Sequence, residues 1–113
     1  MTSTSSRITV VARVHAKDGR EKEVLDQLVA LLEPTRQEEG CLRYDLHTPL
    51  EAPGQFLFYE TWESREHLEH HARSPHIQAF RARSAGLLAV PTEITIWKRL
   101  DDSMLCEGVG QSR

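Results

Sequence analysis

The chain has 113 residues, which is long enough for one domain with a single core and too short for two. Its contents of 39% hydrophobic and 27% charged residues are ordinary for a soluble globular protein and exclude a chain that is disordered throughout. The net charge is -3 with both signs mixed along the sequence, and without a basic stripe to neutralise phosphates we expect no binding of nucleic acid.

Signals for a membrane or for secretion are missing from the sequence. No apolar stretch approaches the roughly 20 residues of a membrane helix, so we expect no membrane association. The segment Met1–Ser6 is rich in Ser and Thr and lacks the apolar core of a signal peptide, which predicts a cytoplasmic protein. Cys41 and Cys106 have the spacing of neither a metal site nor a disulfide framework, and we expect Cys41 to be a small buried side chain.

The first part of the chain predicts a strand followed by an amphipathic helix. Ile8–Ala16 is rich in β-branched residues, which is typical of a strand, and Lys17–Gly19 forms a turn. From Arg20 onward the apolar residues recur with helical spacing, and Pro34 is expected to kink this helix. Gly40 is the natural stop, because a left-handed conformation costs glycine little. The predicted buried face comprises Val24, Leu28, Leu31, Leu32 and Thr35, widened by Leu25 and Val29.

The remaining sequence predicts a hairpin, a helix in two halves and a final strand. The loop between the two strands of the hairpin is short. A serine precedes each half of the helix as a predicted N-cap, and in the second half a proline follows it at the first helical position. In chain order, the predicted elements are the strands Cys41–Thr48 and Gln55–Trp62, helices beginning at Ser64 and at Ser74-Pro75, and the strand Thr92–Leu100.

The order of these elements predicts an α+β fold. Strand-helix-strand occurs twice, and this βαββαβ order is that of a ferredoxin-like domain, in which an antiparallel sheet carries the helices on one face. We expect the domain to span residues 8–100, between a flexible N-terminus of residues 1–7 and a flexible tail of residues 101–113.

The predicted strands are partly apolar on both faces. Phe56, Phe58 and Trp62 point to one side of their strand, whereas Leu57 and Tyr59 point to the other. One chain supplies helices for only one face of the sheet, so we expect a second copy to cover the other face in a homodimer. The other two strands are predicted to split in the same way, with Leu42, Tyr44 and Leu46 against Cys41, and Val10, Ala12 and Val14 against Val11.

Two segments resemble a known family. Glu38-Glu39-Gly40-Cys41, after an amphipathic helix, resembles the E-x-G-C motif of the antibiotic biosynthesis monooxygenase superfamily. The segment Glu60–Phe80 is similar to the W-E-S-x-x-x-L-x-x-H-x-x-x-x-P-H stretch of its bacterial quinol monooxygenases, and the resemblance covers Ile8–Leu100. It implies a dimeric α+β barrel with a small pocket in each subunit, and oxygenation of a small aromatic substrate by dioxygen without flavin, metal or haem.

Relatives with this fold have other activities, so the fold alone does not choose among them. They include an isomerase that processes a quorum signal, haem-degrading enzymes and domains with no assigned chemistry. The haem-degrading relatives use an asparagine on the first strand, and this chain contains no asparagine, which disfavours haem oxygenation.

Histidines gather at the break in the second helix. With about 100° per residue, His71 and His76 are predicted to edge an apolar pocket, while His70 faces solvent. An imidazole suits a base at neutral pH, so His71 or His76 is the predicted catalytic acceptor of a phenolic proton. The predicted walls that bind the aromatic substrate are Trp62, Tyr44 and Phe80. The alternative is structural, with the histidines bracing the helix break and Trp62 packing in the core.

A metal site is a second interpretation of the histidines. His67 and His71 have the i, i+4 spacing that places two imidazoles on one helix face, and His76 supplies a third candidate ligand. The neighbouring sequence contains no dedicated zinc set, so we expect neither a metal nor another cofactor.

The sequence is therefore consistent with three functions. The first is a cofactor-independent monooxygenase that oxidises a quinol or related phenol with dioxygen. The second is an isomerase or ring-modifying enzyme that acts on a small carbonyl compound. The third is a dimeric ligand-binding or stress-responsive barrel without catalytic activity.

Overall fold

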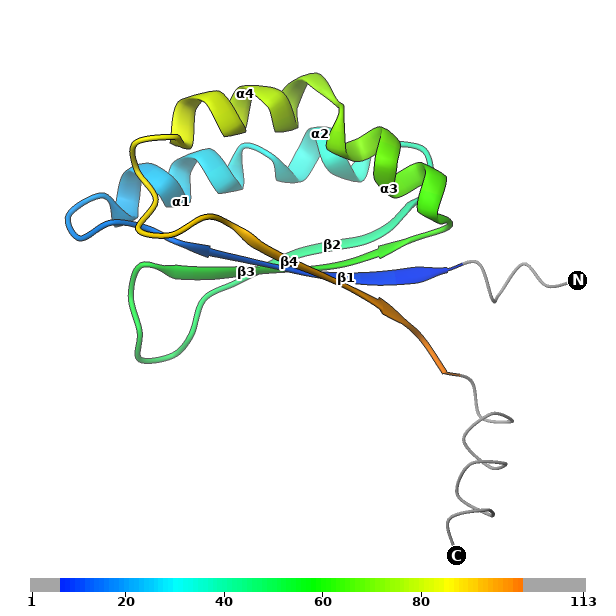
Figure 1. The fold of residues 1–113 in the computed structure, drawn as a ribbon, viewed down its shortest axis with the longest axis horizontal. Coiled ribbons are helices and arrows are strands. Elements are labelled where there is room, and N and C mark those ends of the chain that lie inside the picture. Colours follow the sequence, from blue (N-terminus) through cyan, green and yellow to red (C-terminus); the bar gives the residue numbers. More distant parts are fainter. Residues whose placement is uncertain (1–6, 101–113) are drawn as a thin grey trace, which may run out of the picture.

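The computed structural model describes residues 7–100 and contains a four-stranded antiparallel sheet with helices on one of its faces (Figure 1). The predicted ferredoxin-like α+β fold is confirmed, with both predicted helices divided into two parts. The strands are β1 (Ile8–His15), β2 (Cys41–His47), β3 (Gln55–Trp62) and β4 (Glu93–Lys98), in the order β2-β3-β1-β4. The helices are α1 (Glu21–Val29), α2 (Leu32–Arg36), α3 (Arg65–Ala72) and α4 (Pro75–Ser84).

Some sequence predictions lie outside these residues. The expected flexible N-terminus, apart from residue 7, and the expected flexible tail with Cys106 are not among the described residues. Within residues 7–100, none of the helices is long and apolar enough to span a membrane.

The core forms between the helices and the inner face of the sheet, which we define as the face turned toward the helices. Antiparallel pairing places Ala12 of β1 opposite Phe58 of β3, and Val14 opposite Phe56. Strict alternation then turns these residues inward and buries them, as predicted. On the helical side, the predicted stripe of Val24, Leu28, Leu31 and Thr35 is buried as well.

The break between α1 and α2 has a local cause in Pro34. The helix stops after Val29 and begins again at Leu32, two residues before the proline. Pro34 has no N–H to donate to the carbonyl four residues earlier, and its ring crowds that carbonyl. The predicted width of the α1 face was wrong, because Leu25 and Val29 are 37% and 49% exposed. The buried residues of α1 are the narrower stripe of Val24 and Leu28.

A bulge in β2 corrects the predicted faces of that strand. Cys41 pairs with Trp62, yet Arg43 pairs with the adjacent Thr61, so one extra residue is inserted at Leu42. Because the insertion reverses the alternation, Cys41 packs against the core on the same side as the buried Tyr44. Leu42 is 45% exposed instead of packing beside Tyr44 as the sequence pattern predicted.

Short-range contacts fix the junction between α3 and α4. Ser64 caps α3 as predicted, because its Oγ accepts a hydrogen bond from the His67 amide at 3.3 Å. Ser74 occupies the predicted N-cap of α4, but its Oγ donates to the His71 carbonyl at 2.7 Å and makes no capping bond to its own helix. This bond joins the end of α3 to the start of α4.

Gly40 ends the segment after α2 with a sharp turn. Its φ of +85° lies in the left-handed region, which glycine adopts at little cost. A Cβ at this position would overlap the His67 ring of α3. Glycine thus lets the chain turn into β2 while the preceding Glu38 stays close to the α3–α4 junction.

Candidate active site

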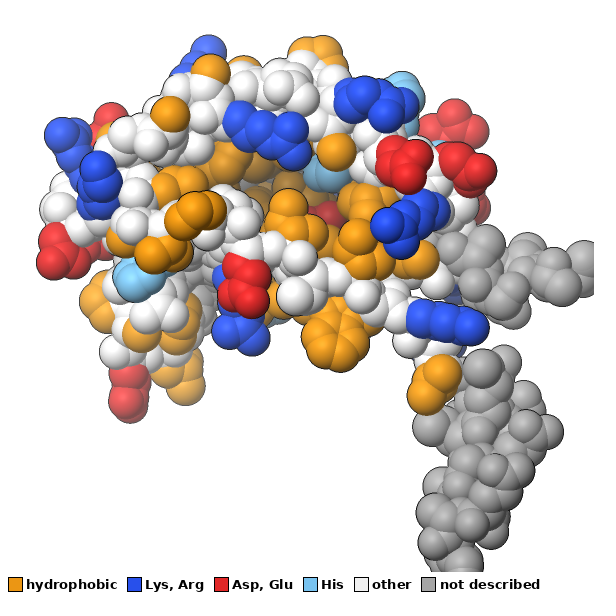
Figure 2. All heavy atoms as spheres, in the orientation of Figure 1, with side chains coloured by type: hydrophobic (Ala, Val, Ile, Leu, Met, Phe, Trp, Pro, Cys, Tyr) orange, Lys and Arg blue, Asp and Glu red, His pale blue; other side chains and the backbone are white. Residues whose placement is uncertain are grey.

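A cavity of about 530 Å³ lies between the inner face of the sheet and the helices. Figure 2 shows it as a hollow lined mostly by hydrophobic side chains, with histidine and acidic atoms at its floor. Its polar lining includes Glu60, His71, Tyr44 and Arg81, set among apolar residues of the sheet and of α4. A mostly apolar cavity of this size with a few converging polar groups is typical of a site for a small organic ligand.

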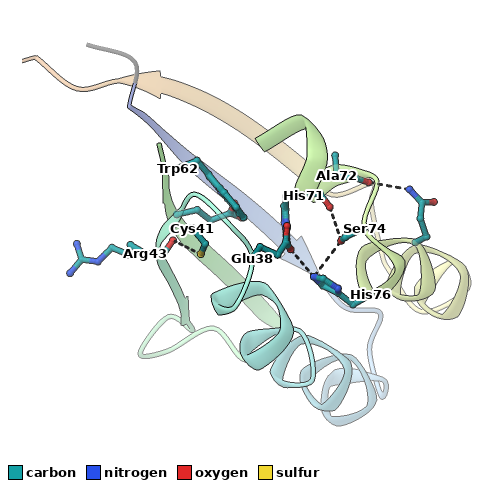
Figure 3. Close-up of polar contacts among 10 residues, drawn as sticks. Glu38, Cys41, Arg43, Trp62, His71, Ala72, Ser74 and His76 are labelled. Atoms are coloured by element: carbon teal, nitrogen blue, oxygen red, sulfur yellow. Dashed lines mark hydrogen bonds and ion pairs between the residues drawn. The ribbon is translucent and has the colours of Figure 1, made fainter. Parts of the chain in front are cut away.

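Glu38 joins the two histidines at the helix break (Figure 3). Its Oε2 lies 2.7 Å from Nδ1 of His71 and 2.7 Å from Nε2 of His76. Glu38 comes from the segment before β2, whereas His71 belongs to the end of α3 and His76 to the start of α4. One carboxylate oxygen therefore accepts hydrogen bonds from two imidazoles that are far from it in sequence. All three side chains are largely buried, with exposed fractions of 11%, 8% and 21% for Glu38, His71 and His76.

The position of His71 is fixed by rings as well as by this hydrogen bond. Its imidazole packs at 4.6 Å from the ring of Trp62 and meets the edge of Tyr44 at 5.6 Å between centroids. Because Nδ1 donates its proton to Glu38, Nε2 of the neutral ring carries the free lone pair. His71 also lines the cavity, whereas His76 is not among the lining residues.

The electrostatic surroundings favour a neutral His71. Burial lowers the pKa of His71 below its ordinary value, while the hydrogen bond and charge of Glu38 oppose this effect. Charge repulsion from the neighbouring His76 and Arg81 also lowers the pKa of His71. A neutral imidazole at physiological pH is the form that can accept a proton.

A second buried acid, Glu60, lines the same cavity. It lies on the inner face of β3, is 4% exposed and accepts a hydrogen bond from Nε1 of Trp62 at 2.9 Å. Burial raises the pKa of Glu60 to about 7, with a smaller contribution from the charge of Glu38. The Trp62 hydrogen bond acts in the opposite direction. Glu60 is therefore partly protonated near neutral pH, unlike an ordinary surface glutamate.

Comparison with known proteins identifies the family. The model of the family described as antibiotic biosynthesis monooxygenase matches residues 7–83. The chain belongs to this family.

Three relatives illustrate how similar its members are to this chain. The uncharacterized protein sll1783 of Synechocystis is 33% identical over 91 residues, which cover 80% of this chain but only 62% of that protein. The putative monooxygenase Rv0793 of Mycobacterium tuberculosis is 32% identical, covering 88% of this chain and 97% of its own length. Its structure superposes with a TM-score of 0.80 over 87% of this chain and 99% of that chain. The probable quinol monooxygenase YgiN of Escherichia coli is 31% identical, covering 70% of this chain and 86% of YgiN.

Within this family fold, the residues predicted from sequence occupy different places. Tyr44 and Phe80 line the cavity together with His71. Trp62 is fully buried and does not line the cavity. It contacts His71 and Glu60, which do line the cavity, from within the protein interior. Burial also raises the pKa of Tyr44, which keeps its hydroxyl protonated.

The histidine arrangement differs from the metal set considered from sequence. His67 bonds to Ser64 at 2.8 Å through Nδ1 and packs at Gly40, away from the other two histidines. The candidate donor set within residues 7–100 is instead Glu38, His71 and His76, whose ligand atoms lie within 4.8 Å of one another. Both imidazole nitrogens approach the same carboxylate oxygen at 2.7 Å, which is the geometry of hydrogen bonds.

Sequence reasoning assigned no role to Glu38 or Glu60. Glu38 opens the E-x-G-C segment, but its partners lie 33 and 38 residues further along the chain, so no local pattern connects them. Glu60 had a visible signal, because alternation along β3 places it on the same face as Phe58 and Trp62. A carboxyl group on a buried apolar face is a candidate for a shifted pKa and a functional role.

Proposed function

We propose that the protein is an enzyme that oxygenates a quinol or related phenolic aromatic with dioxygen, without a metal or organic cofactor, and that His71 is the base. The observation that carries this proposal is the position of His71. Its ring lines an otherwise apolar cavity while its Nδ1 is held by Glu38 at 2.7 Å. A histidine held on one nitrogen by a carboxylate is arranged to accept a proton on the other.

Each group has a distinct part in the proposed proton transfer. Nε2 of His71 takes the phenolic proton, and the carboxylate of Glu38 stabilises the imidazolium that forms. His76 bonds to the same Glu38 oxygen at 2.7 Å and to Ser74 Oγ at 3.3 Å, so it positions the carboxylate and does not touch the substrate. Tyr44 and Phe80 supply flat apolar walls for the aromatic ring.

The chemistry needs no external reductant. The quinolate gives electrons to dioxygen, and a bond forms between a ring carbon and oxygen. The imidazolium of His71 returns its proton to the peroxide, which gives a ring hydroperoxide and restores neutral His71. Loss of water from this adduct leaves a hydroxylated quinone, so that quinol and dioxygen become hydroxyquinone and water. The substrate supplies all four electrons, and the protein deprotonates it, orients it and excludes bulk water.

The family supports the quinol as substrate class. Among the relatives, YgiN carries the name probable quinol monooxygenase, and Rv0793 the name putative monooxygenase. The volume of the cavity, about 530 Å³, suits one or two fused aromatic rings.

The test is oxygen uptake by chelator-treated protein with a panel of quinols, with autoxidation subtracted. We expect uptake above background, incorporation of one labelled oxygen atom from ¹⁸O₂ into the quinone, and loss of both in His71→Ala. The exposed His70 provides the matched control variant, His70→Ala, which should keep full activity. Wild-type protein without uptake on any quinol, or with full uptake in His71→Ala, contradicts the proposal.

We also propose that the enzyme works as a homodimer. The helices of residues 7–100 all lie on one face of the sheet (Figure 1), and on the opposite face Tyr59 and Trp97 are 36% and 57% exposed. A second sheet packed on this surface would bury these side chains. Sedimentation should give a dimer that Trp97→Glu dissociates, and a stable wild-type monomer contradicts it.

A further inference from the structure

We propose that Glu60 is the acid of the reaction, donating its carboxylic proton to the distal oxygen of the ring hydroperoxide so that this oxygen leaves as water. The inference rests on the proposed function and adds a second catalytic group to it. It assigns to Glu60 the choice between two fates of the same intermediate, oxygenation of the ring and release of hydrogen peroxide.

The placement of Glu60 supports this role. It lines the cavity from β3, where it pairs with Val10 of β1 on one side and Tyr44 of β2 on the other. Nε1 of Trp62 donates to its Oε1 at 2.9 Å, and the same indole ring packs against His71 at 4.6 Å. Trp62 therefore holds the proposed acid and the proposed base beside each other at the floor of one cavity.

The hydrogen-bond pattern leaves the proton of Glu60 available. Within residues 7–100, Trp62 is the one hydrogen-bond partner of the Glu60 carboxyl group, and it contacts Oε1 as a donor. Oε2 is therefore free to carry the proton toward the cavity. An apolar wall surrounds this group, formed by Val10, Phe58 and Ile94 among others.

The charges around Glu60 keep part of the population protonated at neutral pH. Burial is the largest influence and raises the pKa of Glu60 to about 7, and the negative charge of Glu38 adds to it. No described cation forms an ion pair with Glu60, although Arg81 of α4 lines the same cavity. The ionisable groups that face it from the other elements are Glu38, Cys41, Tyr44, His71 and Arg81.

The step balances without another reactant. The O–O bond of the hydroperoxide breaks, and the leaving oxygen takes the Glu60 proton to become water. His71 removes the proton from the same ring carbon, and the C–H electron pair forms the new C=O bond. Transfer of that proton from His71 to Glu60 through solvent restores both groups. Without the acid, the same adduct instead expels hydroperoxide, which gives the plain quinone and hydrogen peroxide.

The experiment measures how the products divide, using naphthohydroquinone as the probe with Glu60→Gln, Glu60→Asp and the matched control Glu69→Gln. Glu69 lies on the exposed surface of α3, where its side chain is 57% exposed. We expect wild-type protein and Glu69→Gln to release water and hydroxyquinone. In Glu60→Gln the ratio of hydroxyquinone to hydrogen peroxide should fall about 100-fold, the scale of general acid catalysis, with partial recovery in Glu60→Asp.

Substrate deprotonation separates this role from a structural one. Glu60→Gln should still generate quinolate on anaerobic binding, because His71 performs that step. An unchanged product ratio in Glu60→Gln overturns the inference while leaving the oxygenase intact, whereas wild-type protein without oxygen uptake overturns both. If the variants do not fold, the wild-type product ratio decides, since it should shift toward hydrogen peroxide as pH rises past about 7.

Discussion

Two buried carboxyl groups lie near the same cavity, and their partners differ. Glu38 accepts hydrogen bonds from the imidazoles of His71 and His76, each at 2.7 Å. Glu60 accepts one hydrogen bond, from the indole of Trp62 at 2.9 Å, and lines the cavity itself. Two N–H donors that become cationic when protonated favour a carboxylate, whereas an apolar setting with one neutral donor favours a carboxylic acid.

This difference explains how one small cavity can hold both a base and an acid. Glu38 does not line the cavity, and in the proposed mechanism it acts on the substrate through His71. Glu60 is in the lining and retains its proton to an unusually high pH, because burial raises its pKa to about 7. Environments that move the pKa values of neighbouring groups apart are a common way to divide acid and base work.

The largest expected effect comes from removing the charge of Glu38. In Glu38→Gln the imidazolium of His71 loses its stabilising carboxylate, and we expect kcat for quinol oxygenation to fall by about 100-fold or more. Steady-state oxygen uptake measures this, with Glu39→Gln, an exposed neighbour, as the matched control. Equal activity of the two variants would show that Glu38 has no part in the proton transfer.

The second effect concerns stability and depends on pH. The pKa of Glu60 is about 7 in the folded protein against 4.5 as its ordinary value, so the folded state keeps a proton that the unfolded state releases. The contribution of Glu60 to the free energy of unfolding is fully present below about pH 4.5 and is lost as the pH rises to about 7.

Substitution of Glu60 isolates this contribution. Relative to wild type, Glu60→Gln should gain up to about 3 kcal/mol in the free energy of unfolding between about pH 5 and pH 8. Urea unfolding at both pH values measures the gain, and Glu69→Gln should show none. A difference between wild type and Glu60→Gln that does not change with pH would mean that Glu60 titrates normally.

The smallest effect is expected at His76. Because this side chain contacts Glu38 and Ser74 but not the cavity, His76→Gln should reduce kcat by about tenfold and leave KM unchanged. The acid limb of the pH profile should also move, since the charge of His76 contributes to the pKa of His71. A loss as large as that of His71→Ala would instead assign His76 a direct role as base.

The fold could be predicted from sequence because its signals are local. Alternation in Gln55–Trp62, the helical spacing from Val24 to Thr35 and the turn at Gly40 each depend on neighbouring residues. The bulge at Leu42 was not predicted, because it is visible only in the pairing of β2 with β3.

The candidate site was predictable only in part. The helical angles of His71 and His76 indicated which histidines turn inward, but both remained equal candidates for the base. The cavity distinguishes them, because His71 lines it and His76 does not. Their shared contacts with Glu38 span 33 and 38 residues and likewise follow from tertiary packing alone. Trp62 was assigned to the pocket wall, and the depth of its burial behind His71 is likewise a property of the packed fold.

The most direct measurement of the central claim is anaerobic binding of naphthohydroquinone at about pH 6.5, near the ordinary pKa of histidine. The absorption of the quinolate reports proton transfer to the protein without any oxygen chemistry. We predict quinolate in wild-type protein and in Glu60→Gln, and protonated quinol in His71→Ala and Glu38→Gln. Quinolate of equal intensity in His71→Ala, or none in wild-type protein with bound quinol, would contradict the assignment of His71 as the base.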